Sequence, residues 1–400
     1  MRASCRIIVA LLIAGSLALL AIPLRVQSVP LYAARTGLMC QTCHFDPNGG
    51  GPRNEFGFGF AKNRHLLTPE DSTSRWADLT VANRVGENTP VYFGVNQRFM
   101  LLANRHLSAE RPERLGFFNM ENAIHLAFQP HSMLTLVYTL DAGIAPPPYT
   151  AHSQEAFGMI GGLPSNGYIK AGRIRPPFGL RMDDHTVATR NGFGDFGTVP
   201  GFFLPYDPRR TDMGIEVGAD RAGWFGRAAF TNGQSSLFSG SGYAEAKTVK
   251  LGYSMPRFEA GVSLYDDFLK SGTNPLVRFT RWGGYGMTHY GPFALLGEIA
   301  AGTDEDLAVG GSRNLLAGFA ELDWAAAREY NVRARYDRVV LDRGADEATR
   351  DASTFHRYAL EGEWVPVPFA ELRWTLRYLD PKDPNGDDER QTYLQFHFSY

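Results

Sequence analysis

The chain has 400 residues, of which 44% are hydrophobic, 12% aromatic and 20% charged. This composition excludes a disordered chain and leaves room for one large domain or two ordinary ones. The 40 basic and 42 acidic residues nearly cancel, so no surplus of positive charge indicates a nucleic-acid partner. The 43 glycines, 27 phenylalanines and 17 tyrosines favour many short strands and turns over an α/β enzyme.

Residues 1–28 have the pattern of an export signal. Two arginines precede an apolar run over residues 7–22, and Ser28 ends a candidate cleavage site. A single membrane anchor is the alternative, because this run approaches the length of a short spanning helix. Cleavage near Ser28 would remove Cys5 and leave two cysteines in the mature chain, too few to staple a fold of this size.

Cys40, Cys43 and His44 form a C-x-x-C-H motif, the pattern that attaches c-type haem through two thioethers while the histidine binds iron. The spacing lets both sulfurs reach one edge of the porphyrin and lets the next imidazole turn to the iron. A zinc site would need a second ligand pair, and a thioredoxin-like pair would need a βαβ context that is not visible here. A short-loop disulfide is the remaining alternative. The motif predicts one haem c with His44 as the proximal ligand.

The second axial position of such a haem sets its potential, or allows ligand chemistry if it stays open. The candidates nearest in sequence are His65, Met39, Met100 and His106. Met39 is adjacent to Cys40 and is poorly placed to reach the far face of the ring. His65 follows a Gly-Pro region at residues 49–52, so the chain can fold back over the haem. We therefore expect His65 as the distal ligand, with an ordinary solvated histidine as the alternative.

Residues 29–70 are expected to form a monohaem cytochrome c-like plug, followed by a linker over residues 71–89. The plug is too short to build its own core, so the apolar residues around a haem there must come partly from outside the plug. Part of that cover would come from four aromatic residues, Phe45, Phe56, Phe58 and Phe60. The same side chains could instead pack against neighbouring protein without a cofactor.

Residues 90–400 alternate repeatedly with period two, the signature of strands with one apolar and one polar face. Over residues 369–379, apolar Leu372, Trp374 and Leu376 alternate with Arg373 and other polar residues. The polar face is too charged for a packed core, and apolar outward with polar inward is typical of a membrane barrel with a wet lumen. At roughly 20 residues per strand and connection, about 310 positions predict about 16 strands.

A soluble β-sandwich is the alternative architecture, since its strands also alternate. Aromatic residues near strand ends favour the membrane, and these are Trp324, Tyr336, Trp364 and Tyr378. The chain also ends on an aromatic strand that finishes at Tyr400. The predicted fold class is therefore an all-β transmembrane antiparallel barrel with a short N-terminal haem-binding plug, in which residues 90–400 form the barrel.

The stretch over residues 175–210 interrupts the strand rhythm with five prolines and several glycines. A long irregular connection of this kind is usually functional or mobile. It could fold into the lumen as a constriction, but a solvated external loop is the favoured interpretation. Folded inward, it would bring Asp183, Asp184, His185, Arg209 and Arg210 towards the pore axis. His185 with Asp183 and Asp184 could hold a metal ion, but three polar residues in a loop are weak evidence of a metal site. No hydrolase motif is present.

A haem motif followed by a barrel resembles the fused monohaem cytochrome–porin family of bacterial outer membranes, best known from iron-oxidising bacteria. The resemblance is sharpest over residues 30–62, where Tyr32–Gly37 occupies the place of the family's conserved run before C-x-x-C-H. Arg35 and Phe58 depart from that pattern, and a run of three glycines at residues 49–51 lengthens the connection. The resemblance implies electron transfer across the outer membrane, without fixing Fe(II) as the donor.

The leading interpretation is electron transfer through the haem between an extracellular donor or acceptor, with Fe(II) one candidate, and a periplasmic carrier such as a soluble cytochrome. An Fe(II):cytochrome oxidoreductase activity and an oligomeric state are left open. The plug over residues 29–70 would face the periplasm or the barrel lumen. Lipid of the outer membrane would surround the barrel. The alternatives are a passive diffusion porin with an N-terminal plug and a haem-based sensor.

Overall fold

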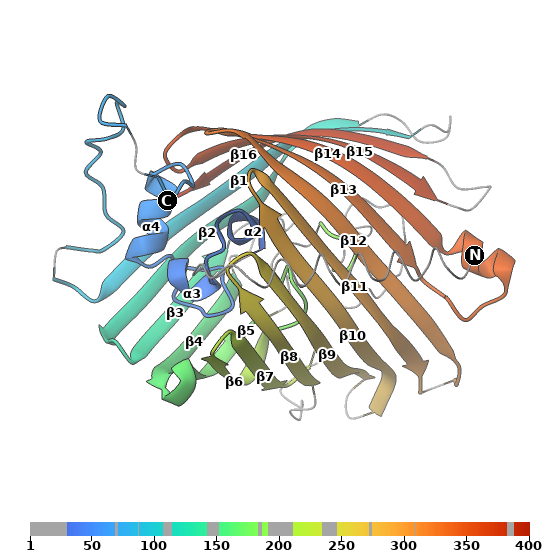
Figure 1. The fold of residues 1–400 in the computed structure, drawn as a ribbon. Helices are drawn as coiled ribbons and strands as arrows, with labels where there is room; N and C mark the ends of the chain where they lie inside the picture. The colour runs from blue at the N-terminus through green and yellow to red at the C-terminus, as the bar shows by residue number, and fades with distance from the viewer. Residues whose placement is uncertain are drawn as a thin grey trace, which may run out of the picture.

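The computed structural model describes residues 30–68, 71–86, 88–106, 114–141, 152–182, 186–190, 211–233, 246–271, 274–307, 309–381 and 388–400. The expected export signal lies outside these residues. Within them, sixteen antiparallel strands form a closed barrel in which each strand pairs with its neighbours in sequence and β1 pairs with β16 (Figure 1). The predicted all-β class and strand number are confirmed, and the sandwich is excluded.

The strands are β1 Val91–His106, β2 Arg114–His131, β3 Leu134–Asp141, β4 His152–Leu163, β5 Gly167–Ile174, β6 Asp212–Arg221, β7 Trp224–Thr231, β8 Ala246–Met255, β9 Phe258–Ser271, β10 Asn274–Tyr290, β11 Phe293–Asp306, β12 Ser312–Ala327, β13 Tyr330–Val340, β14 Thr354–Val367, β15 Ala370–Pro381 and β16 Glu389–Ser399. The helices are α2 Pro30–Thr36, α3 Cys40–Cys43, α4 Glu55–Lys62 and α5 Glu347–Ala352, with a 3-10 turn at Pro164–Asn166. Among the described residues, no helix has the length and apolar character needed to cross a membrane.

The alternation predicted for β15 is present in the structure. Glu371, Thr375 and Arg377 are buried on the lumen face, whereas Trp374 and Leu376 are 43% and 37% exposed on the outer face. Successive side chains of a strand point to opposite faces, so the sequence period translates directly into an apolar exterior and a polar interior. This arrangement is typical of a barrel whose outer surface contacts lipid.

Aromatic residues gather where strands end. Tyr330 stacks on Trp364 with ring centroids 5.9 Å apart, and Phe293 stacks on Trp324 at 6.2 Å. Both pairs lie at the barrel end where short turns join β10 to β11, β12 to β13 and β14 to β15. The C-terminal residue Tyr400 is tied into the barrel seam through backbone hydrogen bonds to Val95. The barrel therefore closes on the aromatic C-terminal strand that the sequence predicted.

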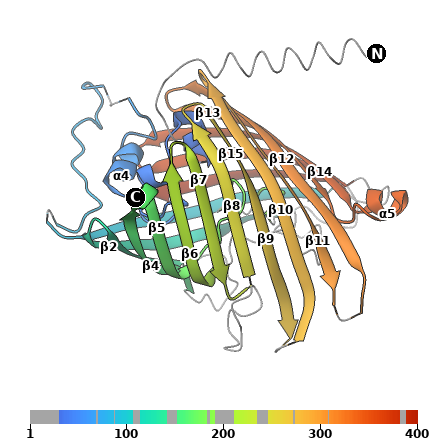
Figure 2. The same cartoon turned by 60° about the horizontal axis from the view of Figure 1, so that its bottom comes forward.

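The two ends of the barrel differ. Two-residue turns join β6 to β7 and β10 to β11 at one end, whereas α5 lies in the β13–β14 connection at the other. Helices α2, α3 and α4 lie at the end with the short turns, together with the C-terminus (Figures 1 and 2). The N-terminal segment, defined here as residues 30–68, is thus seated at the short-turn mouth of the lumen.

The favoured external placement of the stretch over residues 175–210 is wrong for its described part. Residues 175–182 and 186–190 fold into the lumen, where Arg190 pairs with Glu298 at 2.9 Å and the Ala188 amide donates to Asp337 at 3.0 Å. Gly179 has a φ of +67°, and a Cβ there would overlap the Glu298 carboxylate. The lumen side chains supply enough partners to bury this irregular backbone. The suggested metal residues at positions 183–185, and the arginines at positions 209 and 210, lie outside the described residues.

The outward position of Leu376 predicts the effect of charge on the lipid-facing surface. Leu376→Arg should cost about 2–4 kcal/mol of stability in lipid vesicles, because a guanidinium at mid-strand would face hydrocarbon. Chemical unfolding of the vesicle-embedded protein measures this cost, with Leu376→Phe as the control. Equal unfolding midpoints for the two variants would show that this face does not contact lipid.

Candidate functional site

The C-x-x-C-H sequence forms one helical turn, and residues 44–53 after it form a loop that returns to this turn. The His44 amide donates to the Cys40 carbonyl at 2.9 Å, and His44 itself is extended and forms an antiparallel bridge with Arg53. The Asn54 amide then donates to the Cys43 carbonyl at 3.0 Å. This loop returns the chain to its starting point, so α4 begins beside the two cysteines.

Helix α4 packs closely against this turn. Asn54 caps the helix by accepting a hydrogen bond from the Gly57 amide at 2.9 Å. A Cβ at Gly57 would overlap the carbonyl oxygen of Cys43, so glycine is required for the approach of the two backbones. Phe58 and Phe60 of this helix are buried, as is Phe45, but Phe56 is 47% exposed and does not supply the cover expected of it.

Both cysteines are free thiols rather than a disulfide. Burial raises the pKa of the Cys40 thiol to about 12, and it also raises the pKa of the Cys43 thiol. Both groups are therefore neutral at physiological pH in the protein without a cofactor. The short-loop disulfide considered as an alternative is not formed in this structure.

A buried ion cluster holds the loop after His44 against the barrel wall. The Lys170 ammonium on β5 lies 3.0 Å from the Asp46 carboxylate and 3.2 Å from that of Glu216 on β6. Asn48 donates to Glu216 at 2.7 Å. Each charge is paired, as burial requires, so the cluster fixes the loop to one side of the lumen.

On the other side of the lumen, residues of α2 and Arg53 bond to the barrel wall. The Arg35 guanidinium bridges Asp323 on β12 and Glu363 on β14, the latter at 2.8 Å. The Tyr32 hydroxyl donates to Glu371 on β15 at 3.0 Å, and Arg53 donates to the Ser399 carbonyl at 2.7 Å. The N-terminal segment is therefore bonded to strands around the barrel rather than tethered at a single point.

A cavity of about 300 Å³ lies between the N-terminal segment and the barrel wall. Cys43, His44 and His65 line it, so the fold brings three of the four predicted site residues to one place. Cys40 lies at a neighbouring pocket of about 50 Å³, beside Lys250 and Glu259.

His65 follows α4 in a left-handed conformation with φ +62°. Its ring centroid is 4.2 Å from that of Tyr32 and 5.6 Å from that of Phe60. Both ring nitrogens are buried, and neither has a hydrogen-bond partner among the described residues. Burial, reinforced by Arg53, lowers the pKa of His65 to about 3, so the ring is neutral. A neutral imidazole is the form that binds metals, and its role as distal ligand stays a prediction.

Sequence reasoning missed His125 on β2, which lines the same cavity. It lies 82 positions beyond Cys43 and reaches the site only because the barrel closes around the N-terminal segment. Its one sequence signal was its place on the polar face of an alternating strand. Of the other ligand candidates, Met100 lines the cavity, Met39 faces the smaller pocket, and the side chain of His106 lies outside the described residues.

The residues present fit a c-type haem better than a bare metal ion. Within the described residues, no three His, Cys, Asp or Glu side chains are grouped to hold an ion. Cys43 and His44 line the cavity together with His65 and His125, whereas Cys40 of the same turn faces the smaller pocket. Phe60, Met100 and Met120 supply buried apolar cover. These are the residue types that would hold a covalently attached haem.

The fold is similar to that of outer-membrane porins. An anion-selective porin from Comamonas acidovorans matches at a TM-score of 0.62 and 11% identity, covering 78% of this chain and all of that one. OprB of Pseudomonas putida matches at 0.58 and 10%, covering 78% and 94%, and the channel DcaP of Acinetobacter baumannii at 0.53 and 11%, covering 80% and 100%. No protein-family model and no curated protein sequence matches the chain. At these identities the likeness establishes the porin fold alone.

If the Lys170–Asp46–Glu216 cluster holds the N-terminal segment in the lumen, loss of the Lys170 charge should loosen the segment. Lys170→Met would leave the Asp46 and Glu216 carboxylates buried without their cation, at a cost of about 3–5 kcal/mol. We expect this variant to release the loop, which raises single-channel conductance in planar bilayers and exposes the segment to trypsin.

The matched control is Arg278→Ala, which removes the exposed ion pair of Arg278 with Asp266. Exposed pairs contribute about 0–1 kcal/mol, so its conductance and trypsin sensitivity should equal those of the unaltered protein. Unchanged conductance in Lys170→Met would mean that the cluster does not hold the segment.

Proposed function

We propose that this protein is a barrel of the bacterial outer membrane that holds one haem c in its lumen and carries electrons between the two sides of the membrane. The observation that carries the proposal is the position of the C-x-x-C-H turn: Cys43 and His44 line a cavity inside a barrel. Cys40 and Cys43 would form the thioethers and His44 would ligate the iron. Bound there, the haem supplies a one-electron redox centre.

The porin fold and the apolar exterior support the outer-membrane location. In bacterial barrels the short turns face the periplasm and the longer loops face outward. The N-terminal segment lies at the short-turn end (Figure 2), which supports a periplasmic position for the haem. A soluble periplasmic carrier could then dock at this mouth, while an extracellular redox partner would approach from the loop end.

The cavity wall also suits the two carboxylate groups that a haem carries on one edge. Arg333, Arg335, Arg373 and Arg377 line the cavity from β13 and β15. Arg333 and Arg373 are themselves held by carboxylates, with Arg333 3.1 Å from Glu363. Glu361 lies among these arginines on the cavity wall, and the four guanidinium groups outnumber it.

The proposed haem is tested by the pyridine haemochrome spectrum of the purified full-length protein. We expect one haem per chain, and its loss from the Cys40→Ser/Cys43→Ser double variant with the barrel still folded. Spectroelectrochemistry with and without Fe(II) then tests whether Fe(II) is a donor. A folded, colourless unaltered protein would refute the electron-transfer function.

Passive diffusion is the second candidate function, and the porin fold is the observation that favours it. Under that function the double cysteine variant should keep the solute flux of the unaltered protein in liposome-swelling assays, and the unaltered protein should carry no haem. The comparisons, which match porins, are on the side of this candidate. The ion pairs that hold the described parts of residues 30–68 and 175–190 against the wall are on the side of electron transfer, which needs a fixed centre.

A further inference from the structure

His125 lies on the lumen face of β2, and a neighbour fixes the orientation of its ring. Its Nδ1 is 3.0 Å from the Thr139 hydroxyl, which lies directly opposite on β3. The side chain is 4% exposed, and Nε2 is buried with no hydrogen-bond partner among the described residues. With the proton on Nδ1, the Nε2 lone pair is available to the cavity. A metal-ligating histidine has this arrangement, in which one ring nitrogen is held and the other binds.

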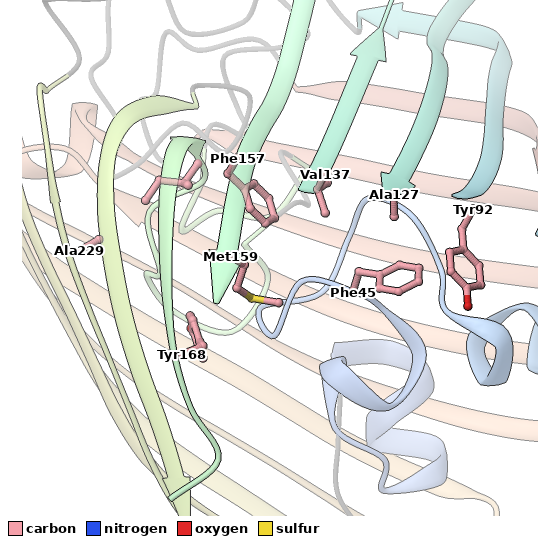
Figure 3. Packing of buried hydrophobic residues seen from close by; sticks show 9 residues of the cluster. Phe45, Tyr92, Ala127, Val137, Phe157, Met159, Tyr168 and Ala229 are labelled. Carbon is pink, nitrogen blue, oxygen red and sulfur yellow. The ribbon is translucent and has the colours of Figure 1, made fainter. Parts of the chain in front are cut away.

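The packing of Phe45 brings the haem motif to this part of the wall. Phe45 follows His44 and belongs to a buried cluster with Ala127 and Val137 (Figure 3). Ala127 lies two residues from His125 along β2, so both project from the same face of the strand. Phe45 therefore places the chain that follows the C-x-x-C-H motif against the part of β2 that carries His125, and His44 and His125 line the same cavity.

The return loop approaches the same place. A Cβ at Gly51 would lie 3.7 Å from the Thr139 hydroxyl oxygen, which is the partner of His125. Gly51 and His44, from the two ends of this loop, line the same cavity as His125. Opposite His125 on β1 stands Gly94, which places no side chain against the cavity.

His65 is held differently. Tyr32 and Phe60 pack against its ring, but among the described residues no hydrogen bond fixes its orientation or selects its tautomer. It also lies on the short N-terminal segment, whereas His125 lies on a strand paired on both sides. A ligand on a rigid element with a fixed ring is better organised for metal binding.

We propose that His125 of the barrel wall, rather than His65, is the second axial ligand of the haem, and that Thr139 is its positioning residue. This inference rests on the proposed function. With one ligand on the N-terminal segment and the other on the wall, the haem would join the two parts of the protein. Attachment of the cofactor would then also anchor the segment in the lumen.

The test compares full-length His125→Ala and His65→Ala proteins, each with its haem content measured as the pyridine haemochrome. The His125 variant should keep its haem, lose the six-coordinate low-spin spectrum of the reduced protein, and bind carbon monoxide. Added imidazole should restore the low-spin spectrum. The His65 variant should keep the low-spin spectrum and exclude carbon monoxide.

A low-spin spectrum in haem-loaded His125→Ala would overturn the proposal, whether or not His65→Ala loses it. Absence of haem from the unaltered protein would instead refute the proposed function, and this inference with it. For Thr139, the valine variant should shift the midpoint potential of the haem and the serine variant should restore it. No shift in Thr139→Val would remove that residue's assigned role.

Discussion

The antiparallel pairing of β1 with β16 is the constraint on which the rest of the structure depends. It removes the edges of the sheet and gives the strands two unlike surfaces, one apolar and outward, the other polar and enclosed. A barrel of sixteen strands is too wide for its own side chains to fill. The lumen must therefore hold either water or other parts of the chain.

Two segments from outside the strands, residues 30–68 and the described part of residues 175–190, occupy that space, and buried ion pairs join both of them to the wall. Arg35 of the N-terminal segment pairs with Glu363 of the wall, and Lys170 of the wall pairs with Asp46 of the segment. In the same way, Arg190 joins residues 186–190 to Glu298 of the wall. Ions buried in this way are costly unless each has a partner, so the polar lumen face and the segments must match residue by residue. The charged side chains on the lumen face of the strands are thus the partners that hold the two segments in place.

The candidate site is built at the junction of these two parts. The C-x-x-C-H turn is local, because its hydrogen bonds join residues 40–54. Its surroundings are not local, since the cavity is completed by residues of strands at both ends of the barrel sequence, including His125 on β2 and Tyr393 on β16. A segment too short to have a core obtains one from the barrel, through clusters such as Phe45 with Val137 and Phe58 with Phe369.

The sequence by itself determined the elements with a local cause. Period-two alternation specified the faces of strands such as β15, and chain length specified the approximate strand number. The spacing of Cys40, Cys43 and His44 predicted a haem-attachment turn, and that chemistry stays a prediction. Tertiary structure alone decided that residues 175–182 and 186–190 fold inward, that Phe56 stays exposed and Phe45 is buried, and that His125 shares a cavity with His44. The reason is that these outcomes depend on which strands meet across the lumen, and barrel closure joins residues whose separation in the sequence carries no periodic signal.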